Sequence, residues 1–219
     1  MTEVLSDRGG HRALGRGAGG SGPKGEAISA AALRLFLRDG YERTSVDAIA
    51  AEAGVSKRTI YNRYGDKENL FLSVLKETFT TMLAAFGRIA DAHLTDVTDV
   101  QQDLTAFARD VAFKILRSPE RIDLIRLMMA EAPHFPALMR EQARPQTMTG
   151  RMAAALARLA RAGVLEIADP VEAADHFSAL TFGQINNKTM FGSVPVSDAD
   201  VERMVTGGVG AFVRAYRPR

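Results

Sequence analysis

The sequence contains no cysteine and no tryptophan. Without cysteine the chain can form no disulfide, no thiolate zinc site and no cysteine nucleophile. We also find no run that approaches the ~18 consecutive apolar residues of a membrane-spanning helix. Residues 1–25 are rich in glycine and arginine, whereas a signal peptide has an apolar core. These absences predict a cytoplasmic protein with no membrane partner.

Neither sign of charge is in large excess, since 28 lysine and arginine residues against 26 acidic residues give a formal net charge of +2. The distribution of charge is therefore more informative than its sum. Residues 56–67 hold four cations and one anion, whereas residues 169–202 hold six carboxylates and one lysine. This asymmetry favours a basic face near the N-terminus and another role for the C-terminal half.

Residues 1–24 contain seven glycines and no apolar periodicity, so we expect a disordered basic tail. The tail could reach into DNA as a basic arm or simply be solvated. Helical periodicity begins at Ala27 and stops at Gly40, which suits the position after a helix end. A second helix is predicted to open at residues 44–47, where a hydroxyl and the Asp47 carboxylate would satisfy free amides. A third would begin at Ser56.

The remaining periodicity is helical as well. A fourth helix is predicted from Asp66 to about Ala92. Five more are predicted over 98–117, 119–131, 136–162, 169–191 and 197–216. The sequence has no alternating pattern of useful length and no internal repeat, so the predicted fold class is all-α.

Residues 46–62 form the motif with the clearest chemistry. The apolar residues of its first helix share one face, and Gly54 permits the positive φ of a tight turn. Val55 and Ile60 then pack the second helix back onto the first. Hydrogen-bond donors on the second helix face outward and suit DNA phosphates and base edges: Lys57, Arg58, Thr59 and Asn62. A helical hairpin that does not bind DNA could share the apolar spacing but would not need these outward-facing donors. The pattern predicts a helix-turn-helix.

These residues resemble the TetR/AcrR family of transcriptional regulators. The resemblance extends from Ala31 to Leu75 and includes Gly40-Tyr41, Thr44-Ser45-Val46, Ile49-Ala50, Ala53-Gly54-Val55-Ser56, Thr59-Ile60-Tyr61-Asn62-Arg63-Tyr64 and Asp66-Lys67-Glu68-Asn69-Leu70-Phe71. It implies that Thr44 and Tyr61 contact phosphates and that Lys67 lies near the DNA backbone. It also implies that four residues face the major groove: Lys57, Arg58, Thr59 and Asn62. Tyr61 could alternatively be a core aromatic. Arg58 is the candidate for base reading, since arginine is the commonest bidentate partner of guanine.

A looser resemblance covers the C-terminal half. Residues 126–138 resemble the Glu-Ala-x-x-Phe-Pro-x-Leu junction of one TetR C-terminal subfamily. This implies a helical ligand domain whose last two long helices pair with a second subunit. The last predicted helix carries an apolar stripe that we assign to the dimer interface, with core packing inside one subunit as the alternative: Met204, Val205, Gly208, Val209 and Phe212.

Methionine and phenylalanine side chains of the middle helices predict an apolar ligand pocket, because methionine adapts to irregular shapes. For any single one of them, plain core packing is the alternative. The first candidates for ligand contact are Met128, Met129, Phe135, Met152 and Phe182.

The histidines and Glu131 are the residues to consider for metal binding or catalysis. His93, His134 and His176 fit no metal spacing and accompany no acid pair or nucleophile elbow. Glu131 is interpreted as a helix-end charge. No enzyme activity, metal or cofactor is therefore predicted.

The expected organisation is an N-terminal three-helix DNA-binding domain over 25–72 with a helix-turn-helix, followed by a larger helical ligand-binding and dimerisation domain over 73–219. Such a chain would be a homodimeric repressor, released from double-stranded operator DNA by a small apolar effector. One alternative is a constitutive DNA-binding protein without an effector. Another is a small helical enzyme with a DNA-binding head, which would need convergent titratable residues in a pocket.

Overall fold

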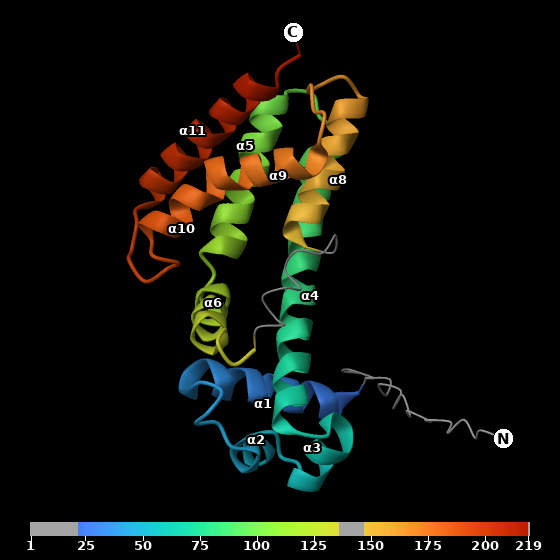
Figure 1. Ribbon diagram of the computed structural model, residues 1–219, viewed down its shortest axis with the longest axis vertical. Helices are drawn as coiled ribbons and strands as arrows, with labels where there is room; N and C mark the ends of the chain where they lie inside the picture. The colour runs from blue at the N-terminus through green and yellow to red at the C-terminus, as the bar shows by residue number, and fades with distance from the viewer. Residues whose placement is uncertain (1–21, 136–146, 219) are drawn as a thin grey trace, which may run out of the picture.

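The computed structural model describes residues 22–135 and 147–218. Within these ranges the chain is helical and contains no strand (Figure 1), which confirms the all-α prediction. The first four helices are α1 (Pro23–Asp39), α2 (Val46–Glu52), α3 (Lys57–Tyr64) and α4 (Lys67–Leu94). The later ones are α5 (Val100–Val111), α6 (Pro119–Glu131), α8 (Met148–Arg161), α9 (Pro170–Ser178), α10 (Gln184–Lys188) and α11 (Asp198–Tyr216).

Two short π-helical turns interrupt the C-terminal helices. The turn η1 (Ala112–Leu116) continues α5, so the helix expected over 98–117 is α5 followed by η1. The turn η2 (Ala179–Gly183) joins α9 to α10 inside the segment expected as one helix over 169–191. The helix expected over 136–162 is α8 in its described part, and residues 136–146 lie outside the described residues.

Local capping explains where the first helices begin. Ser45, Ser56 and Asp66 are the N-caps of α2, α3 and α4, and each side chain accepts a backbone N–H three residues further on. α1 begins at Pro23, four residues before the expected start, because a proline at the first helical position loses no hydrogen bond. The expected tail therefore overlaps α1 at its end, and its residues 1–21 lie outside the described residues.

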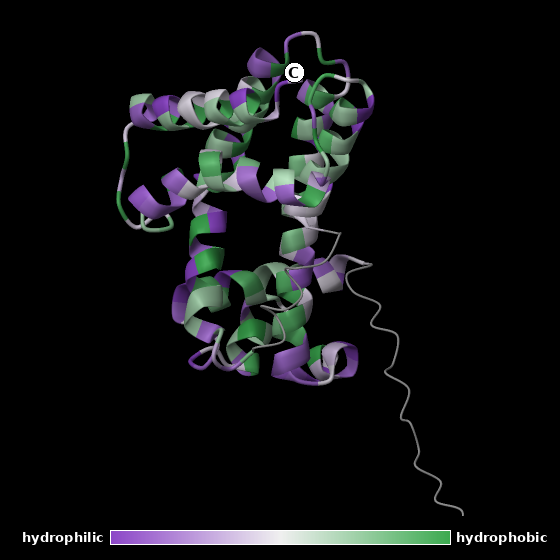
Figure 2. Cartoon of the chain, turned by 45° about the horizontal axis from the view of Figure 1, so that its top comes forward, coloured by the Kyte–Doolittle hydropathy of each residue, from purple (hydrophilic) through white to green (hydrophobic). Residues whose placement is uncertain are grey.

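The buried apolar side chains form two clusters, and hydrophobic stretches occur in both groups of helices (Figure 2). We call the group α1–α3 with the start of α4 the head. The head cluster includes Ile28, Phe36, Ile49, Ile60, Leu70, Phe71 and Val74, and α6 adds Leu124, Leu127 and Met128. The second cluster joins the end of α4 to α5, η1, α8, α9, η2, α10 and α11. The domain boundary expected at residue 72 thus falls within α4, which continues unbroken.

By length and composition alone, α4 could cross a membrane, although no segment of the sequence was expected to do so. Its apolar side chains have partners in this structure, however. Phe71 and Val74 pack into the head cluster, and Phe86, Ala90 and Leu94 pack into the second cluster. α4 is therefore accounted for as a core helix that connects the two groups.

Candidate nucleic-acid interface

α2 and α3 form a tight helical pair at the end of the molecule farthest from α11 (Figure 1). Gly54 has the positive φ of 65° that the turn requires, and the Val55 amide donates to the Ala50 carbonyl at 3.0 Å. Ile49 and Ile60 are buried and hold the two helices against α1 and α4. This is the geometry expected of a helix-turn-helix, and it leaves one face of α3 in solvent.

Arg58, Tyr61 and Asn62 lie on that solvent face. Tyr61 is 42% exposed, so it is not a core aromatic. Arg58 and Asn62 are exposed, and in the described part of the chain their side chains make no hydrogen bond or ion pair. A free guanidinium and a free carboxamide on one short helix can donate to phosphate oxygens or to base edges.

Lys57 is already paired. Its ammonium lies 2.8 Å from the Asp47 carboxylate of α2, and this partner raises the pKa of Lys57. Asp47 was expected to cap amides of α2, but Ser45 does so alone, accepting the Ala48 N–H at 3.1 Å. With Ser45 as the N-cap, Asp47 is the second residue of α2, one before the position from which a capping-box carboxylate reaches back, and it bonds Lys57 across the turn instead. Thr59 bonds the Ser56 hydroxyl at 2.8 Å.

Thr44 differs from the expectation that it contacts phosphate. Its side chain is buried, at 2% exposure, and its hydroxyl lies 2.7 Å from the Gly40 carbonyl oxygen and 3.2 Å from that of Leu35. Gly40 directly follows α1, so its carbonyl has no helical partner, whereas Leu35 lies within the last turns of α1. The Thr44 hydroxyl therefore closes the α1–α2 loop and is not offered to DNA in this structure.

Lys67 holds the same loop from the other side. Its ammonium donates to the Glu42 carbonyl at 3.2 Å and lies 4.3 Å from the centre of the Tyr41 ring. The cation therefore sits at the first turn of α4, beside the α1–α2 loop, and its contact with the DNA backbone stays a prediction. Arg63 packs its guanidinium over Gly25, where a Cβ atom would come within 2.5 Å, so it braces α3 against α1.

The five residues proposed to contact a ligand are not brought together. Met128 and Phe135 belong to the head cluster, whereas Met152 and Phe182 belong to the second cluster. Met129 is 56% exposed. The expected common pocket is therefore corrected: apolar residues on successive helices pack into two separate cores, as the alternative of plain core packing allowed.

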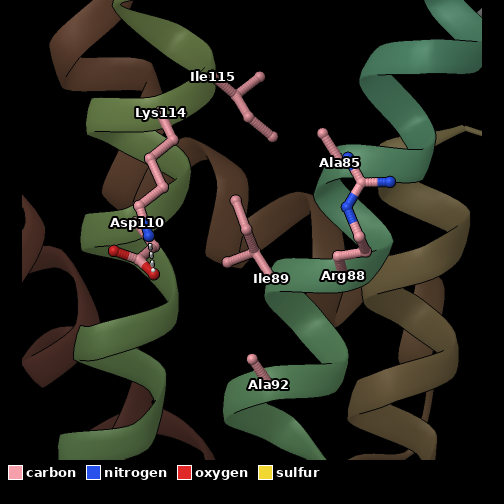
Figure 3. A pocket seen from close by; sticks show the side chains of 7 residues that line it. All are labelled: Ala85, Arg88, Ile89, Ala92, Asp110, Lys114 and Ile115. Atoms are coloured by element: carbon pink, nitrogen blue, oxygen red, sulfur yellow. Dashed lines mark hydrogen bonds and ion pairs between the residues drawn. The ribbon is translucent and has the colours of Figure 1, made fainter.

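Two hollows lie against α5 instead, and neither contains a residue of that set. One of about 300 Å³ opens between α4 and the α5–η1 segment, and Figure 3 shows α4 side chains facing it from one side and α5–η1 side chains from the other: Ala85, Arg88, Ile89, Ala92, Asp110, Lys114 and Ile115. We call it the α4–α5 hollow. The second, of about 550 Å³, is lined by His93, Ala106, Arg109, Asp110, Phe113, Asp198 and Glu202.

Asp110 lines both hollows and is fixed by two partners. His93 Nε2 lies 3.0 Å and Lys114 Nζ lies 2.8 Å from its carboxylate. The hydrogen bond from His93, and then that from Lys114, lower the pKa of Asp110. Sequence reasoning missed this group, although the spacing of Asp110 and Lys114 was a signal for a pair on one helical face.

The apolar stripe of α11 faces its own subunit. Val205, Val209 and Phe212 are fully buried against α5 and η2, and Met204 is nearly so. Gly208 lies so close to the Leu180 carbonyl that a side chain would collide with it. The assignment of this stripe to a dimer interface is therefore wrong, and core packing is right. The outward side of α11 carries Arg203, Thr206, Gly207 and Arg214.

Among the described residues, no group of three or more His, Asp or Glu side chains could hold a metal ion. Each of the three histidines noted in the sequence has a local partner instead. His93 bonds Asp110, His134 Nδ1 lies 3.2 Å from Glu131, and His176 Nδ1 lies 2.7 Å from the Tyr216 hydroxyl.

Comparison with known proteins agrees with this architecture. Residues 28–74 match the model of the bacterial regulatory proteins of the tetR family, and residues 102–218 match the C-terminal domain of AefR-like transcriptional repressors. The HTH-type transcriptional regulator YvkB of Bacillus subtilis is 24% identical over 194 residues, which is 88% of this chain and 96% of that protein.

Solved structures are similar as well. A TetR-family regulator from Mesorhizobium loti has a TM-score of 0.81 and 29% identity, with 89% of this chain and 97% of that one covered. The flavonoid-responsive regulator FrrA has a TM-score of 0.71 and 30% identity, with 90% and 98% covered. The C-terminal model alone spans more than half of the chain. With its helix-turn-helix head and helical C-terminal half, the chain belongs to the TetR family of transcriptional regulators.

Proposed function

We propose that this regulator is a homodimeric repressor that binds operator DNA through α3 and leaves it when a small organic effector binds the C-terminal helices. The observation that carries the proposal is the solvent face of α3, where Arg58 and Asn62 are exposed and unengaged among the described residues. A repressor is favoured over an activator by the match to the C-terminal domain of AefR-like repressors. DNA binding of this kind would take place in the cytoplasm.

The α4–α5 hollow is the proposed effector site. Ala85, Ile89 and Ile115 give it an apolar wall, while Arg88 and Lys114 add cations. This mixture suits an aromatic molecule that carries hydroxyl or acidic groups better than a purely apolar one. The relative FrrA is flavonoid-responsive by name, and flavonoids are molecules of this class.

Dimerisation would use the outward side of α11. A single helix-turn-helix reads too few bases for useful specificity, so two heads on a near-palindromic operator are expected. Thr206 and Gly207 are exposed there, and nothing lies within 4 Å of the position that a Gly207 side chain would take. Small residues of this kind let two helices approach closely.

Selection of bound fragments from genomic DNA tests the proposal. We expect enrichment of one near-palindromic sequence. The wild-type protein should bind it with a nanomolar dissociation constant at physiological salt concentration. Addition of a panel of flavonoids should then weaken binding for at least one compound, and Ile89→Asp should abolish that response. Enrichment of no sequence would refute the DNA-binding role. An operator that is bound equally with every compound would favour the constitutive alternative.

A further inference from the structure

A buried carboxylate lies where α6 meets the head. Glu131, at the end of α6, is only 7% exposed. One carboxylate oxygen accepts the backbone N–H of Tyr41 at 3.2 Å, and the other lies 3.2 Å from His134 Nδ1. A buried carboxylate is costly unless hydrogen-bonded, so these partners account for its position.

The bond from Tyr41 to Glu131 joins two parts of the chain that are 90 residues apart. Between residues 22–72 and the described residues that follow α4, it is the one hydrogen bond that the structure contains. The neighbouring contacts are apolar: the Phe135 ring lies 5.0 Å from that of Tyr41 and 5.1 Å from that of Phe71. Apolar contacts are not directional, whereas a hydrogen bond fixes distance and angle.

The loop that Glu131 holds borders the proposed DNA-binding face. The Tyr41 ring lies beneath the Lys67 ammonium, and the Glu42 carbonyl accepts a hydrogen bond from that ammonium. Thr44 closes the loop onto Gly40, and α2 begins directly afterwards. The position of this loop therefore sets the position of the helix-turn-helix relative to α6.

We propose that Glu131 is a positioning residue for DNA binding: it fixes the α1–α2 loop, and with it the head, in one orientation relative to the C-terminal helices. The proposal rests on the dimeric function given above, because two heads held rigidly by a dimer have one fixed separation. A looser head would reach half-sites at several separations. Glu131 thus contributes to recognition of operator spacing without contacting DNA.

Amide hydrogen exchange tests the bond directly. Glu131→Gln keeps a carbonyl oxygen for the Tyr41 N–H, whereas Glu131→Leu removes it at similar volume. We expect Tyr41 exchange in the leucine variant to be at least about tenfold faster than in wild type, because the amide loses its acceptor. The Gly40 amide, bonded to the Phe36 carbonyl, should be unchanged, and the glutamine variant should resemble wild type. Unchanged Tyr41 exchange in the leucine variant would overturn the proposal.

The second measurement uses the operator selected with wild-type protein and a version with its half-sites moved one base pair apart. Wild type and Glu131→Gln should prefer the natural spacing by at least about tenfold, and Glu131→Leu by less than about threefold. Leu127→Ala, which weakens the same α6 contact without touching the hydrogen bond, should lower the melting temperature but keep the preference.

An equal loss of preference in Leu127→Ala and Glu131→Leu would assign the effect to stability and overturn the proposal. If the leucine variant does not fold, Glu131→Asp replaces it in both measurements, since it keeps the charge but withdraws the oxygen from Tyr41. A wild-type protein that binds no operator would refute the proposed function, and the exchange experiment would still decide whether Glu131 holds the loop.

Discussion

The Lys57 ammonium and the Asp47 carboxylate lie 2.8 Å apart across the turn between α2 and α3. A cation predicted to face DNA is thus held by an anion of the same motif in the free protein. Both groups are well exposed, so the pair contributes little to stability. Its importance lies in competition, because a DNA phosphate must take the place of Asp47 before Lys57 contributes to binding.

Asp47→Asn should therefore strengthen binding to DNA of any sequence by a few fold at low salt. Freeing one cation adds up to about one phosphate contact, which would steepen the slope of log K against log salt by up to about 0.9. Fluorescence anisotropy over a salt series measures both quantities. Glu120→Gln, an exposed carboxylate on α6, is the control and should change neither. A slope equal to that of wild type would show that Lys57 is not a phosphate contact.

Arg58→Ala should relax specificity at one base pair in each half-site. A bidentate arginine contact discriminates against the wrong base by about 1–3 kcal/mol, and this discrimination is lost with the side chain. Competition between the operator and its single-base variants provides the measurement. Arg158→Ala removes an exposed arginine of α8 and should leave unchanged the ratio of affinities for the operator and each single-base variant. If Arg58→Ala kept every ratio, another residue of α3 would read the bases.

Gly207→Glu and Phe212→Asp should have different consequences for assembly. Gly207 lies on the outward side of α11 with open space beside it, so the glutamate variant should fold and sediment as a monomer. Phe212 is fully buried, and its ring lies 5.1 Å from that of Phe177. Placing a carboxylate there should unfold the chain, at a cost of several kcal/mol.

Sedimentation velocity combined with circular dichroism separates these two outcomes. Ala154→Glu introduces the same charge on the exposed side of α8 and should leave the dimer intact. A dimeric Gly207→Glu variant would mean that subunits do not meet on the outward side of α11.

Asp110 makes stability depend on pH. Its pKa is lowered in the folded protein by the hydrogen bond from His93 and then by that from Lys114. A carboxyl group with a depressed pKa contributes stability above its unfolded value, about 3.9, and loses that contribution as the pH falls through the lower folded value. Asp110→Asn should therefore be less stable than wild type at pH 7, and the difference should shrink below about pH 4.

Urea unfolding at pH 7 and at pH 3 measures this difference. Asp91→Asn, which alters an exposed carboxylate of α4 without an ion pair among the described residues, is the matched control. A stability difference for Asp110→Asn that is the same at both pH values would mean that the carboxylate acts through packing rather than through its charge.

The elements that sequence predicts well are those with local signals. Ser56 and Asp66 lie next to the amides they cap, and the positive φ of Gly54 belongs to a turn of a few residues. The all-α class and the helix-turn-helix follow from such signals together with helical periodicity. The exposed face of α3 follows too, since the buried positions of a short helix determine which residues remain outside.

The direction of a side chain among several possible partners is not local. Val209 and Phe212 are apolar whether they face their own subunit or a second one, so their pattern alone could not separate the two. The Thr44 hydroxyl suits a phosphate as well as the Gly40 carbonyl, and only the closed loop decides between them. Met128 and Met152 look alike in sequence but lie in different clusters, because α6 turns back to the head.

α4 passes from the α4–α5 hollow to the DNA-binding face without interruption, so a small tilt of the helix at the hollow produces a larger displacement at the head. Ile89 and Lys67 are 22 residues apart on it, or about 33 Å at the ~1.5 Å rise per residue of an α-helix. A tilt of about 5° with its pivot at the hollow would move Lys67 by about 3 Å, close to the ~3.4 Å between successive base pairs along one DNA strand. If the α4 helices of two subunits tilted in opposite directions, the distance between the two heads would change by twice this amount. A molecule that tilts α4 by this small angle would thus move the two heads away from the spacing of the half-sites.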